Sequence, residues 1–465
     1  MKNRTVIIST GQDYSKAQNP VSTLLIPPIG ALAMASFLKK HEIPVELIDL
    51  QLDFGIGLSE NSNTKIHQKL IKHLEKSKDS ISWIGVSQTS DIGNGITVAR
   101  KINSVLPEIP IIFGSYAATG SFKSWLRDYH FITAIVLGDG ESAALAISRR
   151  LERGESILSE RVPNLAWRDG EEIRTSVRRS VSPSELPILD FQLIHNPKYY
   201  QNIAIISSRG CPFHCNYCLE NNMRSYAPYP ISWVTRQLEH IKTHLNQDRL
   251  CIYDPIFGVE DERTRKLCRI LKKYHFKYLL ESRCDVLEPD ILPLLKDSGV
   301  EILYLGLESA CPATLVRMDK AASLGQAEDY IKNGLNIMRA CFENDITPVF
   351  GFMINFPGEN EVDYRLNLEF VKQVERIHEE VTSQTGIMTG FIGMTNDTIL
   401  YPGSPLTKKI RPPADHIAEE KAVNGEDPGR SKKTNSNAFR IFRDAIRFYY
   451  TRQTPVAIKR GSVHP

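Results

Sequence analysis

The stretch that decides the fold is SSRGCPFHCNYC at residues 207–218, in which Cys211, Cys215 and Cys218 are spaced Cys-x3-Cys-x2-Cys. It follows the short apolar run IAII, which predicts a loop at the end of a strand. Three thiolates from one short loop can bind three irons of a four-iron cluster and leave the fourth iron open. An open iron predicts an outside ligand, because a purely structural cluster would use a fourth cysteine.

From Ile203 onward, short apolar runs alternate with helical stretches. The expected strands are AIISSRG, LCIYDPIF, YLLESRCDV, EILYLGLES, TPVFGFMINFPG and GIMTGFIGM, and the expected helices lie near residues 231–245, 260–274, 289–298, 326–343 and 361–378. Six such units predict a partial (β/α)6 barrel, about three quarters of a full eight-unit barrel. The chemistry of such a barrel belongs at the C-terminal ends of its strands, where the cysteine loop, YDPIF, ESRCD, GLES and NFPGE stand.

A structural zinc site is the alternative for the cysteine loop, with His214 or a distant cysteine as the fourth ligand. Zinc motifs usually pair two Cys-x2-Cys knuckles, and the sequence has no second knuckle. All eight cysteines lie between Cys211 and Cys341, unlike the dispersed pairs of a secreted disulfide scaffold. A reducing, cytoplasmic setting is therefore expected.

The first part of the chain alternates in the same way. Residues 4–153 contain the apolar runs RTVIIST, VELIDL, WIGVSQT, PIIFGS and AIVLGD with helical stretches between them. This pattern predicts an α/β fold with an N-terminal, doubly wound, Rossmann-like parallel sheet whose ligands bind at the strands' carboxyl ends. The expected domains are a Rossmann-like domain (1–153), a connector with a hairpin around 168–171 (154–200), the partial barrel (201–407), and a mobile segment with a C-terminal amphipathic helix (408–465).

Composition excludes several partner classes. The chain has 465 residues and a net charge of +3 from 57 basic and 54 acidic residues, so its overall charge gives no reason to expect nucleic acid or an anionic membrane. It has no run of eighteen apolar residues, and its N-terminus resembles neither a signal peptide nor a membrane anchor. The partner must be inferred from the sites.

The cysteine loop and its surroundings resemble the radical S-adenosylmethionine (SAM) superfamily. The resemblance implies a 4Fe-4S cluster whose open iron binds SAM, and reductive cleavage of SAM to a 5'-deoxyadenosyl radical. The family's SAM-binding positions fall at strand ends. Here they correspond to Arg283, Gly306, Glu308 and Ser309, with Asp254 as a further family signature and Tyr217 placed to pack on the adenine. No cysteine follows Cys341 to hold an auxiliary cluster, so electrons are expected from an external flavodoxin or ferredoxin.

The front domain resembles the cobalamin-binding domain of one large radical SAM class, through PPIGALAMASFL, WIGVSQTSD, IIFGSYAATG and VLGDGESAALAI in order. The resemblance implies cobalamin at Ser87, Gly114, Ser115 and Gly138. Gly-Ser replaces the usual Gly-Gly at 114–115, and Gly-Asp-Gly-Glu replaces Gly-Glu-Gly-Glu at 138–141. No Asp-x-His-x-x-Gly follows the first strand, so any cobalamin would be bound without a histidine ligand. The same absence would be seen in a domain that had lost cobalamin.

Three functions remain open at this stage. The leading one is a cobalamin-dependent methyltransferase that acts on an unactivated carbon or phosphorus centre of a small molecule or peptide. The second is a radical SAM epimerase, cyclase or ring-contracting enzyme, for which Cys284 and Cys311 are candidate hydrogen donors. The third is a non-catalytic sensor, which would have no use for an open iron.

Overall fold

The computed structural model describes residues 3–410, apart from 11–25, 51, 55–59, 88–91, 198–199, 201, 221–222 and 402. The expected C-terminal amphipathic helix and nearly all of the expected mobile segment lie outside the described residues. By its internal contacts the chain forms two compact units, residues 1–247 with 399–429 and residues 248–398 with 430–465. This division assigns the cysteine loop to the first unit and most of the predicted barrel to the second.

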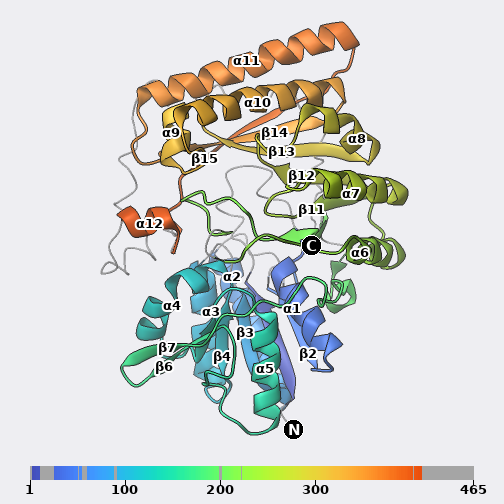
Figure 1. Cartoon of the computed structure of the whole chain (residues 1–465). Helices are drawn as coiled ribbons and strands as arrows, with labels where there is room; N and C mark the ends of the chain where they lie inside the picture. The colour runs from blue at the N-terminus through green and yellow to red at the C-terminus, as the bar shows by residue number, and fades with distance from the viewer. Residues whose placement is uncertain are drawn as a thin grey trace. The chain divides into compact units, whose positions relative to one another are not determined.

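The first unit is built on a seven-stranded sheet with the order β2-β1-β3-β4-β5-β6-β7 (Figure 1). The first five strands pair in parallel, and β6 and β7 continue the sheet as an antiparallel hairpin. The strands are β1 (Arg4–Ser9), β2 (Val45–Asp49), β3 (Ile81–Ser87), β4 (Ile111–Gly114), β5 (Ala134–Val136), β6 (Leu165–Asp169) and β7 (Glu172–Thr175).

Both faces of this sheet are covered by helices, as its apolar strands require. Helices α1 (Ile29–Lys40) and α5 (Glu141–Glu152) contact each other. The other group is α2 (Glu60–Lys76), α3 (Ile92–Val105) and α4 (Tyr116–Asp128), which share one hydrophobic core with the strands. That core includes Leu70, Ile102 and Trp125, all buried. The predicted doubly wound parallel sheet is thus confirmed.

The predicted hairpin around residues 168–171 also forms, but it belongs to the front sheet instead of standing apart in the connector. Ala166 pairs with Ile135 of β5, and the buried residues Leu165 and Trp167 flank it. The Arg168 guanidinium donates to the carbonyls of His130 and Ile132, in the segment that follows α4. The hairpin therefore completes the sheet because its apolar side chains need a buried partner.

The first unit also holds β8 (Ile203–Ile205), the short pair β9 (Ser208–Arg209) and β10 (Ala227–Pro228), and α6 (Ile231–His244). Three described 3-10 turns occur in the chain at Lys78–Ser80, Phe191–Leu193 and Pro289–Ile291. A last short helix, α12 (Pro405–Ile410), returns to this unit.

The second unit contains a parallel sheet with the order β15-β14-β13-β12-β11. Its strands are β11 (Arg249–Ile252), β12 (Lys277–Ser282), β13 (Val300–Glu308), β14 (Thr347–Ile354) and β15 (Ile392–Asp397). Its helices are α7 (Asp261–Tyr274), α8 (Leu292–Asp297), α9 (Pro312–Arg317), α10 (Leu324–Glu343) and α11 (Glu361–Thr385). All six strands expected for the barrel, β8 and β11 to β15, are therefore present.

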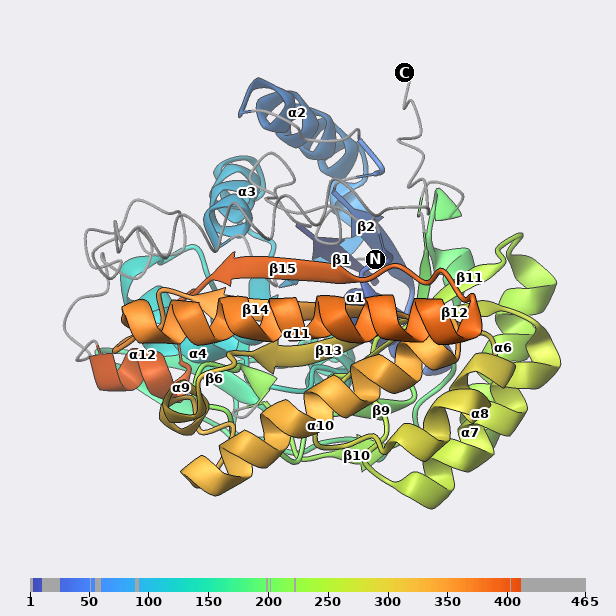
Figure 2. The same ribbon diagram turned by 90° about the horizontal axis from the view of Figure 1, so that it is seen from above.

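Helices α10 and α11 lie side by side along this sheet (Figure 2). The capping box of Asn360 and Asp363 starts α11, and Gly386 in a left-handed conformation ends it. Within the described part of the chain, no helix is both long enough and apolar enough to span a bilayer.

Candidate cluster and cofactor site

The cysteine loop is closed at its base by a two-stranded ladder. Arg209 of β9 pairs with Ala227 of β10, and the Tyr229 amide donates to the Ser207 carbonyl. Gly210 turns the chain out of this ladder with φ of +69°, and a Cβ there would lie 2.3 Å from the Ser225 carbonyl oxygen. Only glycine fits such a position, so the loop enters its turn at a fixed point.

The three cysteines gather on this closed loop. Cys215 is buried, while Cys211 and Cys218 are partly exposed, and the Cys218 amide donates to the Cys215 carbonyl. Burial raises the pKa of Cys218 to about 12, and the neighbouring Cys215 and Cys211 add to the shift. The three sulfurs therefore lie within electrostatic range of one another, as three ligands of one cluster must.

The donor set fits the expected iron-sulfur cluster in kind and in grouping. Thiolates are the usual ligands of such clusters, and three of them stand on one loop. Among the residues that the structure describes, no group of three or more His, Cys, Asp or Glu side chains lies close enough to hold a single metal ion. In a four-iron cluster each cysteine binds a different iron, so its ligands need not converge on one point.

In the second unit, the end of β13 is irregular where GLES was expected to bind SAM. The register between β13 and β14 shifts between Leu305 and Glu308, and Glu308 has φ of +67°. Glu308 Oε1 lies 3.3 Å from Lys320 Nζ, and Lys320 is buried. A Cβ at Gly306 would lie 3.0 Å from that carboxylate oxygen and 3.4 Å from the ammonium. The bulge and the left-handed residue are features that recur beside functional sites.

Arg283 follows β12 and is held by its neighbours. Its guanidinium forms two 2.8 Å bonds with Asp285, donates to the Lys320 carbonyl at 2.9 Å, and lies 5.4 Å from the centre of the Tyr330 ring. The structure therefore brings Arg283, Gly306 and Glu308 together through Lys320. In this state Arg283 is paired with a carboxylate of the chain itself.

Glu281, beside these residues, is a candidate that sequence reasoning missed. It is exposed, pairs with Tyr304 in the β12–β13 register, and has its pKa raised to about 7 by enclosure in the protein and by the Glu308 carboxylate. The signal was present in KYLLES, since residues two apart share a face and the buried Tyr278, Leu280 and Ser282 leave Glu281 on the other.

Four other expected residues follow the strands closely and are buried in the protein. Ser309 is fully buried and accepts a bond from the Cys311 amide, and Asp254 is buried at the end of β11. Cys284 is fully buried; its sulfur would lie 3.2 Å from a Cβ at Gly334 of α10, and burial raises its pKa to about 12. Cys284 therefore packs as core, while Cys311 precedes α9 as its N-cap. The roles expected for all four, and for the partly exposed Tyr217, stay predictions.

The front sheet places two of the expected cobalamin residues, Ser87 and Gly114, at the carboxyl ends of neighbouring strands, in line with Ser9. Ser9, Ser87 and Gly114 end β1, β3 and β4, and they are aligned in the pairing registers. Among the described residues the space above Gly114 is open, because none of their atoms, apart from those of its chain neighbours, lies within 4 Å of a Cβ placed there. Ser115 follows with φ of 86° and ψ of −176°, a conformation otherwise confined almost to glycine. Open space and strained backbone at the carboxyl edge fit a ligand that lies against the strand ends.

Gly138 has a different environment from Gly114. It has φ of +80°, its amide donates to Thr119 Oγ1 at 3.1 Å, and a Cβ would lie 2.4 Å from the Arg178 guanidinium. Arg178 also donates to the Met223 carbonyl. Close packing of an arginine therefore explains this glycine without any ligand.

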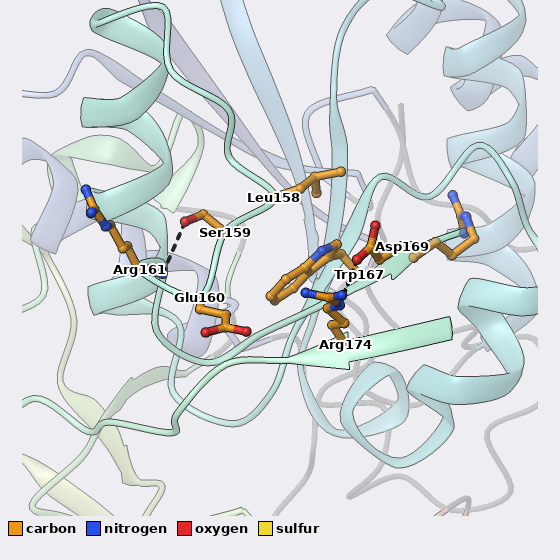
Figure 3. A pocket seen from close by; sticks show the side chains of 8 residues that line it. Leu158, Ser159, Glu160, Arg161, Trp167, Asp169 and Arg174 are labelled. Carbon is orange, nitrogen blue, oxygen red and sulfur yellow. Dashed lines mark hydrogen bonds and ion pairs between the residues drawn. The ribbon is translucent and has the colours of Figure 1, made fainter. Parts of the chain in front are cut away.

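A shallow pocket of about 450 Å³ lies elsewhere, on the hairpin of the first unit (Figure 3). Trp167 lines it together with the ion pair of Asp169 and Arg174, whose atoms are 2.7 Å apart. It contains none of the residues predicted for the cluster, SAM or cobalamin, so the pocket is no part of the candidate site.

Residues 205–371 match the family model of the radical SAM superfamily. Among curated proteins, an uncharacterised methyltransferase of Pyrococcus horikoshii is 21% identical over 77% of this chain and 76% of its own. Hopanoid C-3 methylase of Methylococcus capsulatus is 23% identical, over 65% of this chain and 57% of that enzyme. Anaerobic magnesium-protoporphyrin IX monomethyl ester cyclase of Synechocystis is 25% identical, over 66% of this chain and 62% of that enzyme.

Two solved structures share the fold over 88% of the chain. The radical SAM methyltransferase TsrM from Kitasatospora setae, with cobalamin and a [4Fe-4S] cluster bound, has a TM-score of 0.67 at 13% identity and is covered over 75% of its length. The cobalamin-dependent SAM radical enzyme OxsB, with aqua-cobalamin and SAM bound, has a TM-score of 0.68 at 17% identity and is covered over 60%. The Rossmann-like domain and the partial barrel therefore occur together in known structures.

Proposed function

Because the chain belongs to the radical SAM superfamily, we propose that it is a cobalamin-dependent methyltransferase acting on an unactivated carbon or phosphorus centre. One observation carries the proposal: the closed loop of Cys211, Cys215 and Cys218 belongs to the same compact unit as a front sheet whose carboxyl edge is open above Gly114. When bound, the cluster with SAM supplies a 5'-deoxyadenosyl radical, and cobalamin supplies the methyl group.

The residues of the chain would bind and orient these groups. The three cysteines bind three irons and leave one iron to SAM. Lys320 and Glu308 hold opposite charges at the end of β13, where they suit the carboxylate and the ammonium or ribose hydroxyls of SAM. Glu281, with a pKa raised to about 7, can hold or release a proton on its carboxyl near neutral pH. Gly114 leaves space for the corrin.

The proposed setting and partners follow from this chemistry. The cluster needs a reducing compartment, which we take to be the cytoplasm, and an external one-electron donor such as flavodoxin or ferredoxin. The substrate is a small molecule or a peptide.

A second candidate is a reaction of the same architecture without methyl transfer, such as cyclisation or epimerisation. The likeness to a magnesium-protoporphyrin ester cyclase favours it. Both of its expected hydrogen donors, Cys284 and Cys311, are buried in the protein, which weighs against an epimerase.

The deciding experiment is an anaerobic turnover of the iron-reconstituted chain with hydroxocobalamin, SAM and a reductant. Cobalamin retention is followed by its visible spectrum, and 5'-deoxyadenosine and S-adenosylhomocysteine by chromatography. Bound cobalamin with both products supports the methyltransferase. If 5'-deoxyadenosine forms alone on a chain that retains no cobalamin, the second candidate replaces it. The Cys215→Ala variant is the control, and retained cleavage of SAM in that variant would overturn the assignment altogether.

A further inference from the structure

A cluster of buried charges joins the front domain to the start of the cysteine loop. Arg209, two residues before Cys211, places its guanidinium 2.6 Å from the Glu141 carboxylate and 3.9 Å from Asp139. Arg209 is 8% exposed and Glu141 is 4% exposed, so the pair is almost completely withdrawn from water. A buried ion pair of this kind is sensitive to loss of either partner, because the remaining charge has no solvent to stabilise it.

The other end of the loop is tied to the same domain. Arg224 Nε lies 3.1 Å from Asp139, the same carboxylate that faces Arg209. The Tyr116 hydroxyl, two residues after Gly114 at the carboxyl edge of the front sheet, donates to the Glu220 carboxylate. Glu220 in turn stands two residues after Cys218, and its backbone bonds with the Cys218 thiol. Both flanks of the three cysteines are therefore bonded to side chains of the front domain.

Glu141 and Tyr116 stand at the starts of two helices of the front domain, and their contacts reach outside those helices. Glu141 is the first residue of α5, where a carboxylate already interacts well with the helix dipole and does not need an arginine. Tyr116 opens α4 directly after the strained Ser115. Asp139 and Glu141 of GDGES and Tyr116 of FGSY therefore contact the residues that flank the three cysteines. Both motifs lie in the domain that resembles a cobalamin-binding domain.

We propose that Glu141 and Tyr116 are positioning residues for the cluster: they hold the two ends of the cysteine loop, through Arg209 and Glu220, in the conformation that binds iron. The proposal rests on the proposed function only in taking the three cysteines as cluster ligands. It makes the front domain part of the cluster site, whichever ligand the domain binds at its edge.

The test compares the full-length wild type with Glu141→Gln, Tyr116→Phe and a control, Glu46→Gln. Glu46 is a partly buried carboxylate of the first unit on β2, and its described ion pairs are with Arg4 at 3.0 Å and His73 at 2.7 Å, not with the cysteine loop. Three readouts are used. Hydrogen exchange is measured on the cluster-free chain, and loss of iron to a chelator is measured on the reconstituted chain. The electron paramagnetic resonance spectrum, with and without SAM, is recorded after one-electron reduction of the cluster with dithionite.

We expect Glu141→Gln and Tyr116→Phe to raise hydrogen exchange in residues 208–220 by about tenfold and to lose iron about tenfold faster than the wild type. Both variants should also alter the change that SAM induces in the resonance spectrum. Glu46→Gln should have none of these effects. Glu141→Asp, which keeps the charge, should restore part of the protection. If both test variants match Glu46→Gln in every readout, the contacts are merely structural and the proposal is wrong.

The experiment separates this proposal from the proposed function. A wild-type chain that binds no four-iron cluster would defeat the proposed function, yet exchange of the cluster-free chain would still report whether the loop depends on these residues. Should Glu141→Gln fail to fold, Tyr116→Phe carries the test, because it removes one hydroxyl and leaves the ring in place.

Discussion

Ser115 has a backbone conformation that residues other than glycine rarely adopt. Its φ of 86° and ψ of −176° lie in a region where a non-glycine residue costs of the order of 1–3 kcal/mol. The sequence indicated that this position departs from the Gly-Gly pattern of similar proteins, but not that the departure is strained, because strain depends on dihedral angles that no composition or periodicity specifies.

We therefore expect Ser115→Gly to stabilise the chain by about 1 kcal/mol, the relief of strain less the greater entropy of unfolded glycine. The free energy of unfolding, measured with urea, checks this. Glu42→Gly is the control, since Glu42 is exposed with φ of 60°, where the cost for a side chain is smaller. Equal effects of the two substitutions, or a loss of stability in Ser115→Gly, would contradict the strain.

At the scale of elements, the closed base of the cysteine loop depends on Gly210. Gly210→Ala places a methyl group 2.3 Å from the Ser225 carbonyl oxygen, so the β9–β10 ladder must open or the loop must shift. We expect reconstituted Gly210→Ala to retain less than about a tenth of the wild-type iron, since displaced cysteines no longer share a cluster.

The matched control for this prediction is Gly170→Ala in the turn between β6 and β7. Gly170 has a similar φ of +62°, but a Cβ there lies more than 4 Å from every atom that the structure describes, apart from those of its chain neighbours. The Gly170→Ala substitution should lower the free energy of unfolding by only about 1–2 kcal/mol and leave the iron content unchanged. Equal iron loss in both variants would mean that the left-handed backbone, and not the contact with Ser225, is responsible.

The turn before α11 carries a second prediction. Burial raises the pKa of Glu359 from 4.5 to about 7, although the Phe356 amide donates to it at 2.9 Å. The folded chain therefore holds this proton at pH values where the unfolded chain has released it. The contribution of Glu359 to the free energy of unfolding does not change with pH below 4.5. It falls as the pH rises from 4.5 to 7, and it is constant above pH 7.

Glu359→Gln should remove this loss of stability, which we expect to be about 1–2 kcal/mol between pH 5 and pH 7.5 after allowance for partial solvent access. Urea unfolding at the two pH values measures the difference in both proteins. Glu361→Gln serves as control, because Glu361 forms an exposed ion pair with Arg365. If the wild type and Glu359→Gln lose the same stability over this range, the carboxyl is ionised throughout.

Much of the element level could be predicted from the sequence, and the reasons are local. The parallel strands and the β6–β7 hairpin follow from apolar runs and from Asp169-Gly170, and the cysteine loop follows from its spacing alone. Glu281 and the Arg209–Glu141 pair could not be found by motif. To find Glu281, one must know which face of β12 its side chain occupies. The ion pair joins residues 68 positions apart (209 − 141), which only the folded chain brings into contact.

At the scale of the whole molecule, the chain is divided into two compact units. The edge of the front sheet lies in the first unit, so a ligand bound there stabilises that unit directly, by about 2.7 kcal/mol at a hundred times its dissociation constant. The opening above Gly114 is the space that such a ligand would fill. Gly114→Val fills it from the protein side, and its Cβ would lie more than 4 Å from every atom of the residues that the structure describes, apart from its chain neighbours.

We therefore expect saturating hydroxocobalamin to slow hydrogen exchange in peptides around residues 81–87 and 111–138, and to leave peptides of β12 and β14 unchanged. Gly114→Val should fold with a melting temperature within about 2 °C of the wild type, bind hydroxocobalamin about tenfold to a hundredfold more weakly, and show no such protection. Gly325→Val is the control, because Gly325 is an equally open but exposed position on α10. Protection that persists in Gly114→Val would place the cobalamin elsewhere, and protection absent from the wild type would mean that this edge of the sheet binds no corrin.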